Sequence, residues 1–96
     1  MDIEHVAGFQ WDEGNTEHCQ KHGVSIEDIE EIFFNTPSVL GDPFVDEQRY
    51  RAIGRNYAQR FIYVVFTFRL VEMERYIRPI SARYMHEKEI ERYEKR

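Results

Sequence analysis

The sequence predicts a single α+β domain in which an antiparallel β-sheet of about four strands carries two N-terminal helices and is followed by a C-terminal helix. Three observations support this fold class. Amphipathic helical periodicity is concentrated near the N-terminus, long runs rich in β-branched and aromatic residues begin at residue 49, and the turns between those runs are short. At 96 residues, the chain has the length for one hydrophobic core, so residues 1–96 are expected to form one domain.

The N-terminal part is predicted to contain a short strand and two helices. Residues 7–11 alternate apolar and polar side chains, and Asp12 is a good N-cap for a first helix over 13–22 that ends at Gly23. Ser25 begins the capping pattern SIED, which predicts the start of a second helix. That helix carries apolar residues at helical spacing: Ile26, Ile29, Ile32 and Phe33.

The remainder of the chain has the pattern of a sheet and a charged tail. The predicted segments are strands at 39–40, 49–55, 61–68 and 73–82, and a helix at 86–96. The run at 61–68 is almost continuously apolar or β-branched, which predicts the central strand. Pro79 cannot donate a hydrogen bond to a neighbouring strand, so the last strand is expected at an edge or with a bulge.

Charge is divided unevenly along the chain. The first 48 residues contain twelve Asp and Glu and one cation, Lys21, whereas the rest contains six Glu and twelve Lys and Arg, including all ten arginines. The formal net charge of −5 argues against a nucleic-acid binder. A polyanion, however, responds to the local field of a surface patch rather than to the total charge.

The arginines of the strand at 49–55 are expected on one face of the sheet. Strand alternation places Arg49, Arg51 and Arg55 together, with Tyr50 on the opposite face. Three unpaired guanidinium groups are too costly to bury, so their face should be open to water or to a phosphate-bearing partner. An ordinary solvated surface, acidic on the helices and basic on the sheet, is the alternative explanation.

Cysteine and histidine content limits the other function classes. Cys19 is the lone cysteine, so an internal disulfide is excluded and a reducing, cytoplasmic compartment is the simplest expectation. No apolar stretch approaches 18 residues, which argues against membrane insertion. His18 and His22 are four residues apart, but Cys19 is expected to point elsewhere and no CxxC spacing occurs, so we expect no metal site.

Several short motifs occur in a specific order along the chain: FQWDE at 9–13, KHGVS at 21–25, DP at 42–43, RYRAIG at 49–54, and PISAR at 79–83 ahead of Glu89 and Tyr93. Together they resemble the BrnT family of bacterial toxins. The resemblance implies a RelE-like fold and an endoribonuclease that inhibits translation and growth without a metal or organic cofactor. It also implies a BrnA-like ribbon-helix-helix antitoxin, through which alone the complex would bind operator DNA. The chain departs from the family pattern at Asn15, where members commonly have Lys.

Metal-independent RNA cleavage needs a base for the 2′-OH, an acid for the 5′-oxygen and cations for the phosphorane. Arg83, at the end of the last strand, is our first candidate for holding the scissile phosphate; a salt bridge to Glu89 that fixes the C-terminal helix is the alternative. His22 is the candidate acid or base, with Lys21 beside it for phosphate, unless His22 instead caps its helix. Glu47 is a candidate general base if desolvated, and otherwise an exposed loop carboxylate.

The arginine strand is the candidate RNA-binding element. Arg49, Arg51 and Arg55 would contact phosphates, and Tyr50 or Tyr57 would stack on an unpaired base unless Tyr50 packs under the helices. Two functions stay open at this point. One is an endoribonuclease toxin, and the other is a catalytically inactive module of the same fold that binds an antitoxin and acts as a co-repressor.

Overall fold

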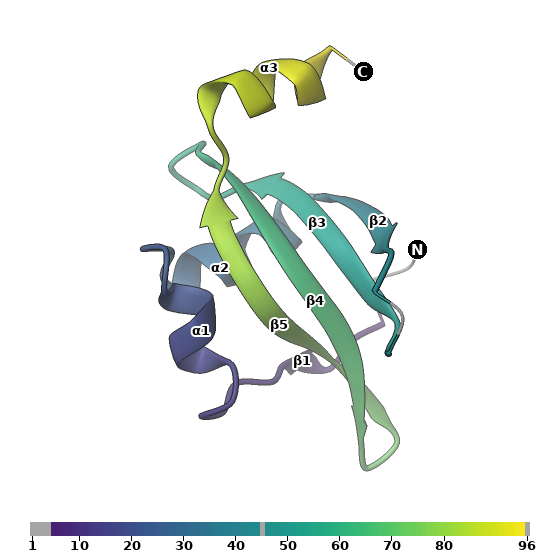
Figure 1. The fold of residues 1–96 in the computed structure, drawn as a ribbon. Helices are drawn as coiled ribbons and strands as arrows, with labels where there is room; N and C mark the ends of the chain where they lie inside the picture. The colour runs from purple at the N-terminus through teal and green to yellow at the C-terminus, as the bar shows by residue number, and fades with distance from the viewer. Residues whose placement is uncertain (1–4, 45, 96) are drawn as a thin grey trace.

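The protein is described here by a computed structural model, which covers residues 5–44 and 46–95. Its elements follow one another in this order: β1 (Gly8–Phe9), α1 (Thr16–Gln20), α2 (Ile26–Phe34), β2 (Ser38–Asp42), β3 (Arg49–Arg55), β4 (Phe61–Val71), β5 (Glu74–Tyr84) and α3 (Glu87–Glu94). The strands form one sheet in the order β1-β5-β4-β3-β2, and α1 and α2 lie against one face of it (Figure 1). The predicted α+β class is confirmed.

The sheet differs from the expected one in strand number and direction. Strands β2 to β5 pair antiparallel, as anticipated. The short β1 adds a fifth strand that runs parallel to β5, with Gly8 opposite Tyr76 and Phe9 opposite Ile77. The short strand predicted within residues 7–11 is therefore present as β1, but its parallel pairing with β5 was not anticipated, because alternation within a segment does not specify its partner.

The predictions for the central strand and for Pro79 are confirmed. Strand β4 lies between β3 and β5 in the middle of the sheet. Val65 pairs with Ser81 and Phe66 pairs with Pro79, so the intervening Ile80 has no partner on β4. This β-bulge next to Pro79 tolerates the missing backbone donor.

Strands β4 and β5 are longer than predicted because their turn lies later in the chain. The strands meet at Glu72 and Met73, whose φ angles of 52° and 71° suit a tight hairpin but are unusual for residues other than glycine. Because neither turn residue is the Gly or Asn that usually marks such a turn, the sequence did not locate it. The hairpin projects beyond the rest of the sheet (Figure 1), with Leu70 and Met73 exposed at its tip.

The hydrophobic core lies between α1, α2 and the sheet face that they cover, which we call the inner face. Phe66 of β4 is fully buried and contacts Phe33 of α2 edge-to-face at 5.1 Å between ring centroids. Gly54 lets α2 approach closely, since a Cβ there would come within 3.1 Å of Pro37 and 3.2 Å of Ile32. Helix α2 therefore sits directly on β3 and β4, α1 packs against β5, and the opposite, open face of the sheet is left for other roles.

The two N-terminal helices differ in how well their starts were predicted. Ser25 caps α2 as expected, since its hydroxyl accepts a hydrogen bond from the Asp28 N–H at 3.1 Å. Helix α1 is shorter than the predicted 13–22 segment, and its N-cap is Asn15 rather than Asp12. The Asp12 carboxylate instead pairs with Arg78 of β5 at 2.9 Å.

Asn15 is a buried polar residue that joins three parts of the chain. It is 3% exposed; its side-chain oxygen accepts from the Asp12 N–H at 2.9 Å, and its amide donates to the carbonyls of Gln10 at 3.0 Å and Pro79 at 2.9 Å. The Asn15 side chain thus links the first loop to the bulged strand.

Replacing Asn15 by Ala should lower the free energy of unfolding by about 2 kcal/mol, because buried backbone groups would lose their partners. Urea denaturation measures this loss. The matched control is Asn35→Ala, which removes a single exposed hydrogen bond to the Arg55 carbonyl and should cost about 1 kcal/mol or less. Equal losses in the two variants would contradict the bridging role of Asn15.

Candidate nucleic-acid interface

Three arginines of β3 and one of β5 lie on the open face of the sheet. Strand alternation in β3 buries Ala52 and Gly54 under the helices and therefore turns the neighbouring arginines to the other side. Arg83 of β5 lies in the same row, since it pairs with Tyr63 and Tyr63 pairs with Ile53. We call this set the arginine face: Arg49, Arg51, Arg55 and Arg83.

Each guanidinium group of the arginine face is already paired with a carboxylate. The ion pairs are Arg49–Glu47 at 3.1 Å, Arg51–Asp42 at 3.4 Å, Arg55–Glu94 at 3.5 Å and Arg83–Glu89 at 2.8 Å. The three arginines of β3 share one open face, as expected, but their guanidinium groups are ion-paired within the chain. Pairs this exposed typically contribute about 0–1 kcal/mol, so phosphate oxygens can exchange with these carboxylates at small cost.

The strongest of these pairs joins Arg83 to α3. Both terminal nitrogens of Arg83 donate to Glu89, each at 2.8 Å, and the His86 N–H donates to the same carboxylate at 3.0 Å. The Arg83 hydrogen bonds, then that of His86, lower the pKa of Glu89 to about 2 and keep it ionised. The salt bridge considered for Arg83 is thus present, and a phosphate at Arg83 would have to displace Glu89.

Helix α3 lies over one end of the open face and is held by side-chain contacts at its surface rather than by buried residues. Figure 1 shows it beyond the end of β5, apart from the α1–α2 layer. Tyr93 makes a short hydrogen bond with Ser38 of β2, and its ring lies 5.8 Å from that of Phe61. None of the residues of α3, all of which the structure describes, is buried. The helix can therefore move relative to the sheet without opening the core.

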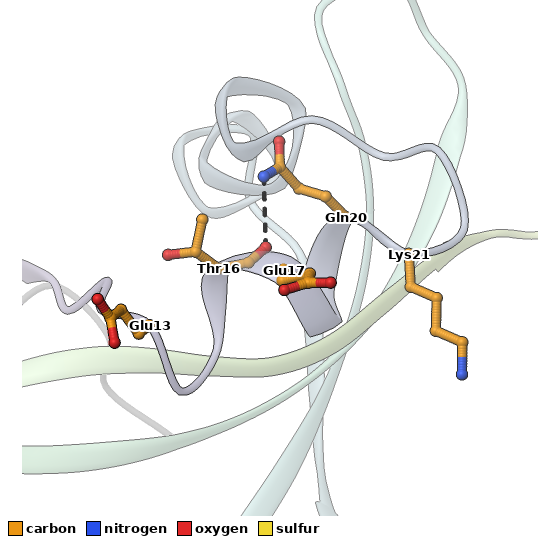
Figure 2. Close-up of a pocket in the computed structure, with 5 residues that line it drawn as sticks. All are labelled: Glu13, Thr16, Glu17, Gln20 and Lys21. Carbon is orange, nitrogen blue, oxygen red and sulfur yellow. Dashed lines mark hydrogen bonds between the residues drawn. The ribbon is translucent and has the colours of Figure 1, made fainter.

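The structure does not bring Lys21 or His22 together with Arg83. Both residues follow α1, which packs on the inner face through the buried Cys19. Figure 2 shows a shallow pocket along α1 in which Lys21 points away from Glu13. The sheet thus separates this pocket from the arginine face.

The two tyrosines considered for base stacking are also placed differently from that hypothesis. Tyr50 packs on the inner face against Phe66 and Phe68, with ring centroids at 5.5 and 5.4 Å. Packing under the helices, the alternative, is therefore what the structure shows. Tyr57 is 64% exposed on the turn between β3 and β4. The arginine face instead carries Tyr63, over whose ring the Arg83 guanidinium lies at 4.6 Å.

Comparison with known protein families matches most of the chain to one of them. Residues 11–89 match the family described as "Ribonuclease toxin, BrnT, of type II toxin-antitoxin system". The chain belongs to the BrnT family. A search of the curated proteins found no match.

Membership of the BrnT family confirms the resemblance carried by the motifs. It identifies the chain as a ribonuclease toxin of a type II toxin-antitoxin system, and so implies an RNA substrate and an antitoxin partner. Within the described ranges, 5–44 and 46–95, every helix is too short or too polar for a transmembrane segment.

Glu47 is not placed as a general base in this BrnT protein. Burial opposes its ionisation, but hydrogen bonds from Arg49 and Arg69 outweigh that effect and lower its pKa. A general base that works near neutral pH needs the opposite shift. The structure is closer to the alternative, an exposed loop carboxylate. Glu47 differs from it in being only about one-third exposed and in forming ion pairs.

Cysteine and metal chemistry have little support among the side chains that the structure places. Burial raises the pKa of Cys19 to about 11, which leaves its thiol protonated and unreactive. In the described part of the chain, His, Cys, Asp and Glu side chains form no group of three that could hold a metal ion.

The tyrosine and histidine near Arg83 were the residues that sequence reasoning undervalued. Tyr63 could have been found from the alternation within β4, because a residue directly next to the buried Ile62 in a strand must face away from the helices. His86 was noted only as a residue at the start of the tail helix. Its position next to the Arg83–Glu89 pair depends on how α3 folds back, which no local pattern encodes.

The Arg83–Glu89 pair should make the docking of α3 dependent on pH. A carboxyl pKa near 2, depressed from 4.5, stabilises the folded form above about pH 4.5, and this contribution is lost as the pH falls from 4.5 through 2. NMR titration of the Glu89 carboxyl carbon measures the midpoint. Arg83→Ala should raise that midpoint toward 4.5, and an unchanged midpoint would contradict the pairing.

Proposed function

We propose that this BrnT family toxin is an active, metal-independent endoribonuclease of RelE-like layout that binds RNA across the arginine face. The observation that carries the proposal is the gathering of Arg49, Arg51, Arg55 and Arg83 on one open face, opposite the helical layer. Such a cationic face binds the RNA backbone despite the net negative charge of the chain, because the phosphates respond to the local field.

Arg83 would be the group that holds the scissile phosphate. Its fork of two donors already grips two carboxylate oxygens, the geometry that a phosphate also offers. Displacement of Glu89 by RNA would place this fixed positive charge where the phosphorane develops, and such charges contribute much of a catalyst's rate enhancement. Cleavage would then lower the cell's capacity for translation and arrest growth.

Proton transfer would be assigned to a group at the same end of the sheet as Arg83. His86 fits this better than His22, because the His86 N–H donates to the carboxylate that binds Arg83, whereas His22 lies across the sheet. Glu47 is ion-paired and so is not favoured as the base.

The antitoxin partner would be a BrnA-like ribbon-helix-helix protein that acts in the cytoplasm and brings the complex to operator DNA. An acidic segment of that protein laid over the arginine face would replace the internal carboxylates and exclude RNA. Glu89 and Glu94 already form ion pairs with Arg83 and Arg55, which supports the view that acidic side chains fit this face.

One observation favours the second function, a catalytically inactive module that only binds the antitoxin. Every arginine of the face has a carboxylate partner within the chain, so the face is largely neutralised. If RNA cannot displace these carboxylates, the fold would serve as a co-repressor partner alone.

Two assays separate the functions. The purified protein should cleave cellular RNA in the presence of EDTA, and its induced expression should arrest growth unless the adjacent ribbon-helix-helix gene is co-expressed. A folded protein that binds the antitoxin but neither cleaves RNA nor arrests growth would support the inactive module instead.

A further inference from the structure

A cavity of about 230 Å³ lies between α3 and the open face of the sheet. The floor is formed by Leu40 of β2, Ile53 of β3 and Tyr63 of β4, and α3 closes the cavity from outside with Tyr93. This volume is below the roughly 300 Å³ at which sites for drug-sized ligands begin. The space therefore suits one planar ring system rather than a larger ligand.

The cavity combines apolar walls with charged groups. Arg51 and Arg92 line it together with the two tyrosines and with Glu89, the carboxylate that pairs with Arg83. The Nε atom of Arg51 is shielded from solvent and makes no hydrogen bond within the described residues, although it lies 3.4 Å from Asp42. Aromatic and apolar walls beside the incompletely satisfied guanidinium group of Arg51 match the chemistry of a base attached to a phosphate.

We propose that this cavity is a nucleobase subsite, which receives an unpaired base of the RNA next to the phosphate held by Arg83. The proposal rests on the proposed ribonuclease function. Tyr63 connects the two sites, because it lines the cavity while the Arg83 guanidinium lies over its ring at 4.6 Å. A base in the cavity thus places its own phosphate within reach of Arg83.

The arrangement also gives α3 a role in binding. Tyr93 keeps its contacts with Ser38 and Phe61 when Glu89 is displaced, because those contacts do not involve the Glu89 carboxylate. The helix can therefore release Arg83 for a phosphate while it still forms the outer wall around the base.

Titration of the full chain with nucleoside 5′-monophosphates and with ribose 5-phosphate, followed by NMR, tests the subsite. The two probes share the anion and differ only in the base. We expect the monophosphates to bind about tenfold more tightly, with shifts at Ile53, Tyr63 and Tyr93, since base stacking on aromatic side chains supplies this preference. Equal affinities for the two probes would overturn the proposal.

A variant in which a large side chain fills the cavity provides a second test of the subsite. Ile53→Trp, or Leu40→Trp if the first variant does not fold, should remove the preference for the base and leave the affinity for ribose 5-phosphate unchanged. Leu70→Trp at the exposed hairpin tip is the matched control and should keep the preference. A preference retained in the filled variant would also overturn the proposal.

The proposed function and the subsite can fail separately. Base-dependent binding in a protein that cleaves no RNA would support the subsite and contradict the nuclease. Cleavage of RNA at the same rate by the wild type and by a folded filled variant would support the nuclease and contradict the subsite.

Discussion

Arg83→Ala should lower the rate of RNA cleavage by about 100- to 1,000-fold, the loss expected when one preorganised donor to a developing oxyanion is removed. The bidentate grip on Glu89 shows that the Arg83 fork is positioned for two oxygens of one acid group. Single-turnover cleavage of a labelled RNA measures the chemical step, and the loss should appear there rather than in binding alone.

Two further variants separate catalysis from the anchoring of α3. Glu89→Gln breaks the same ion pair and keeps the guanidinium, so cleavage should not fall. Arg60→Ala removes an arginine that stacks over Tyr84 at 3.6 Å on the inner side and should leave the rate unchanged. If Glu89→Gln were as impaired as Arg83→Ala, the ion pair would be a structural clamp only.

Phe66→Ala should destabilise the protein by about 3–5 kcal/mol, the usual cost of a large-to-small change at a fully buried aromatic residue. Aromatic rings from α2, from β3 and from β4 itself contact Phe66, so the cavity left by its removal cannot collapse easily. Small domains have about 5–15 kcal/mol in total, so the variant would be close to unfolding at 37 °C.

Guanidinium unfolding followed by circular dichroism measures this loss. Leu70→Ala is the matched control, since Leu70 is 75% exposed on the hairpin tip and should change the stability by less than about 0.5 kcal/mol. A Phe66→Ala loss below about 1 kcal/mol would show that α2 does not depend on the inner face as the packing implies.

Elements with strong local patterns were predictable from the sequence. The capping pattern at Ser25 and the apolar spacing after it located α2, and strand β3 was predicted with the same limits as observed. Elements that depend on distant partners were less predictable. Helix α1 begins at Thr16, directly after Asn15, whose side chain is fixed by the Pro79 carbonyl, a contact between residues far apart in the chain.

The site was predictable in its arginines but not in its surroundings. Period-two alternation placed Arg49, Arg51 and Arg55 on one face correctly. Glu47 is a close neighbour of Arg49 in the sequence, but Asp42 and Glu94 come from β2 and α3, so their pairings could not be foreseen. His22 shares a motif with Lys21 but lies on the helical side, so nearness in sequence did not indicate nearness to Arg83.

The salt dependence of RNA binding tests the central claim, that the arginine face is the RNA-binding surface. The affinity for a single-stranded oligonucleotide should fall steeply with salt, and the Arg49→Glu/Arg55→Glu variant should flatten the logarithmic slope by about 1.4, or about 0.7 for each lost phosphate contact. Arg60→Glu/Arg75→Glu changes the net charge equally on the inner side, where Arg75 stacks over Phe68 at 4.2 Å, and should keep the wild-type slope. Equal slopes for the wild type and the Arg49→Glu/Arg55→Glu variant would contradict the account.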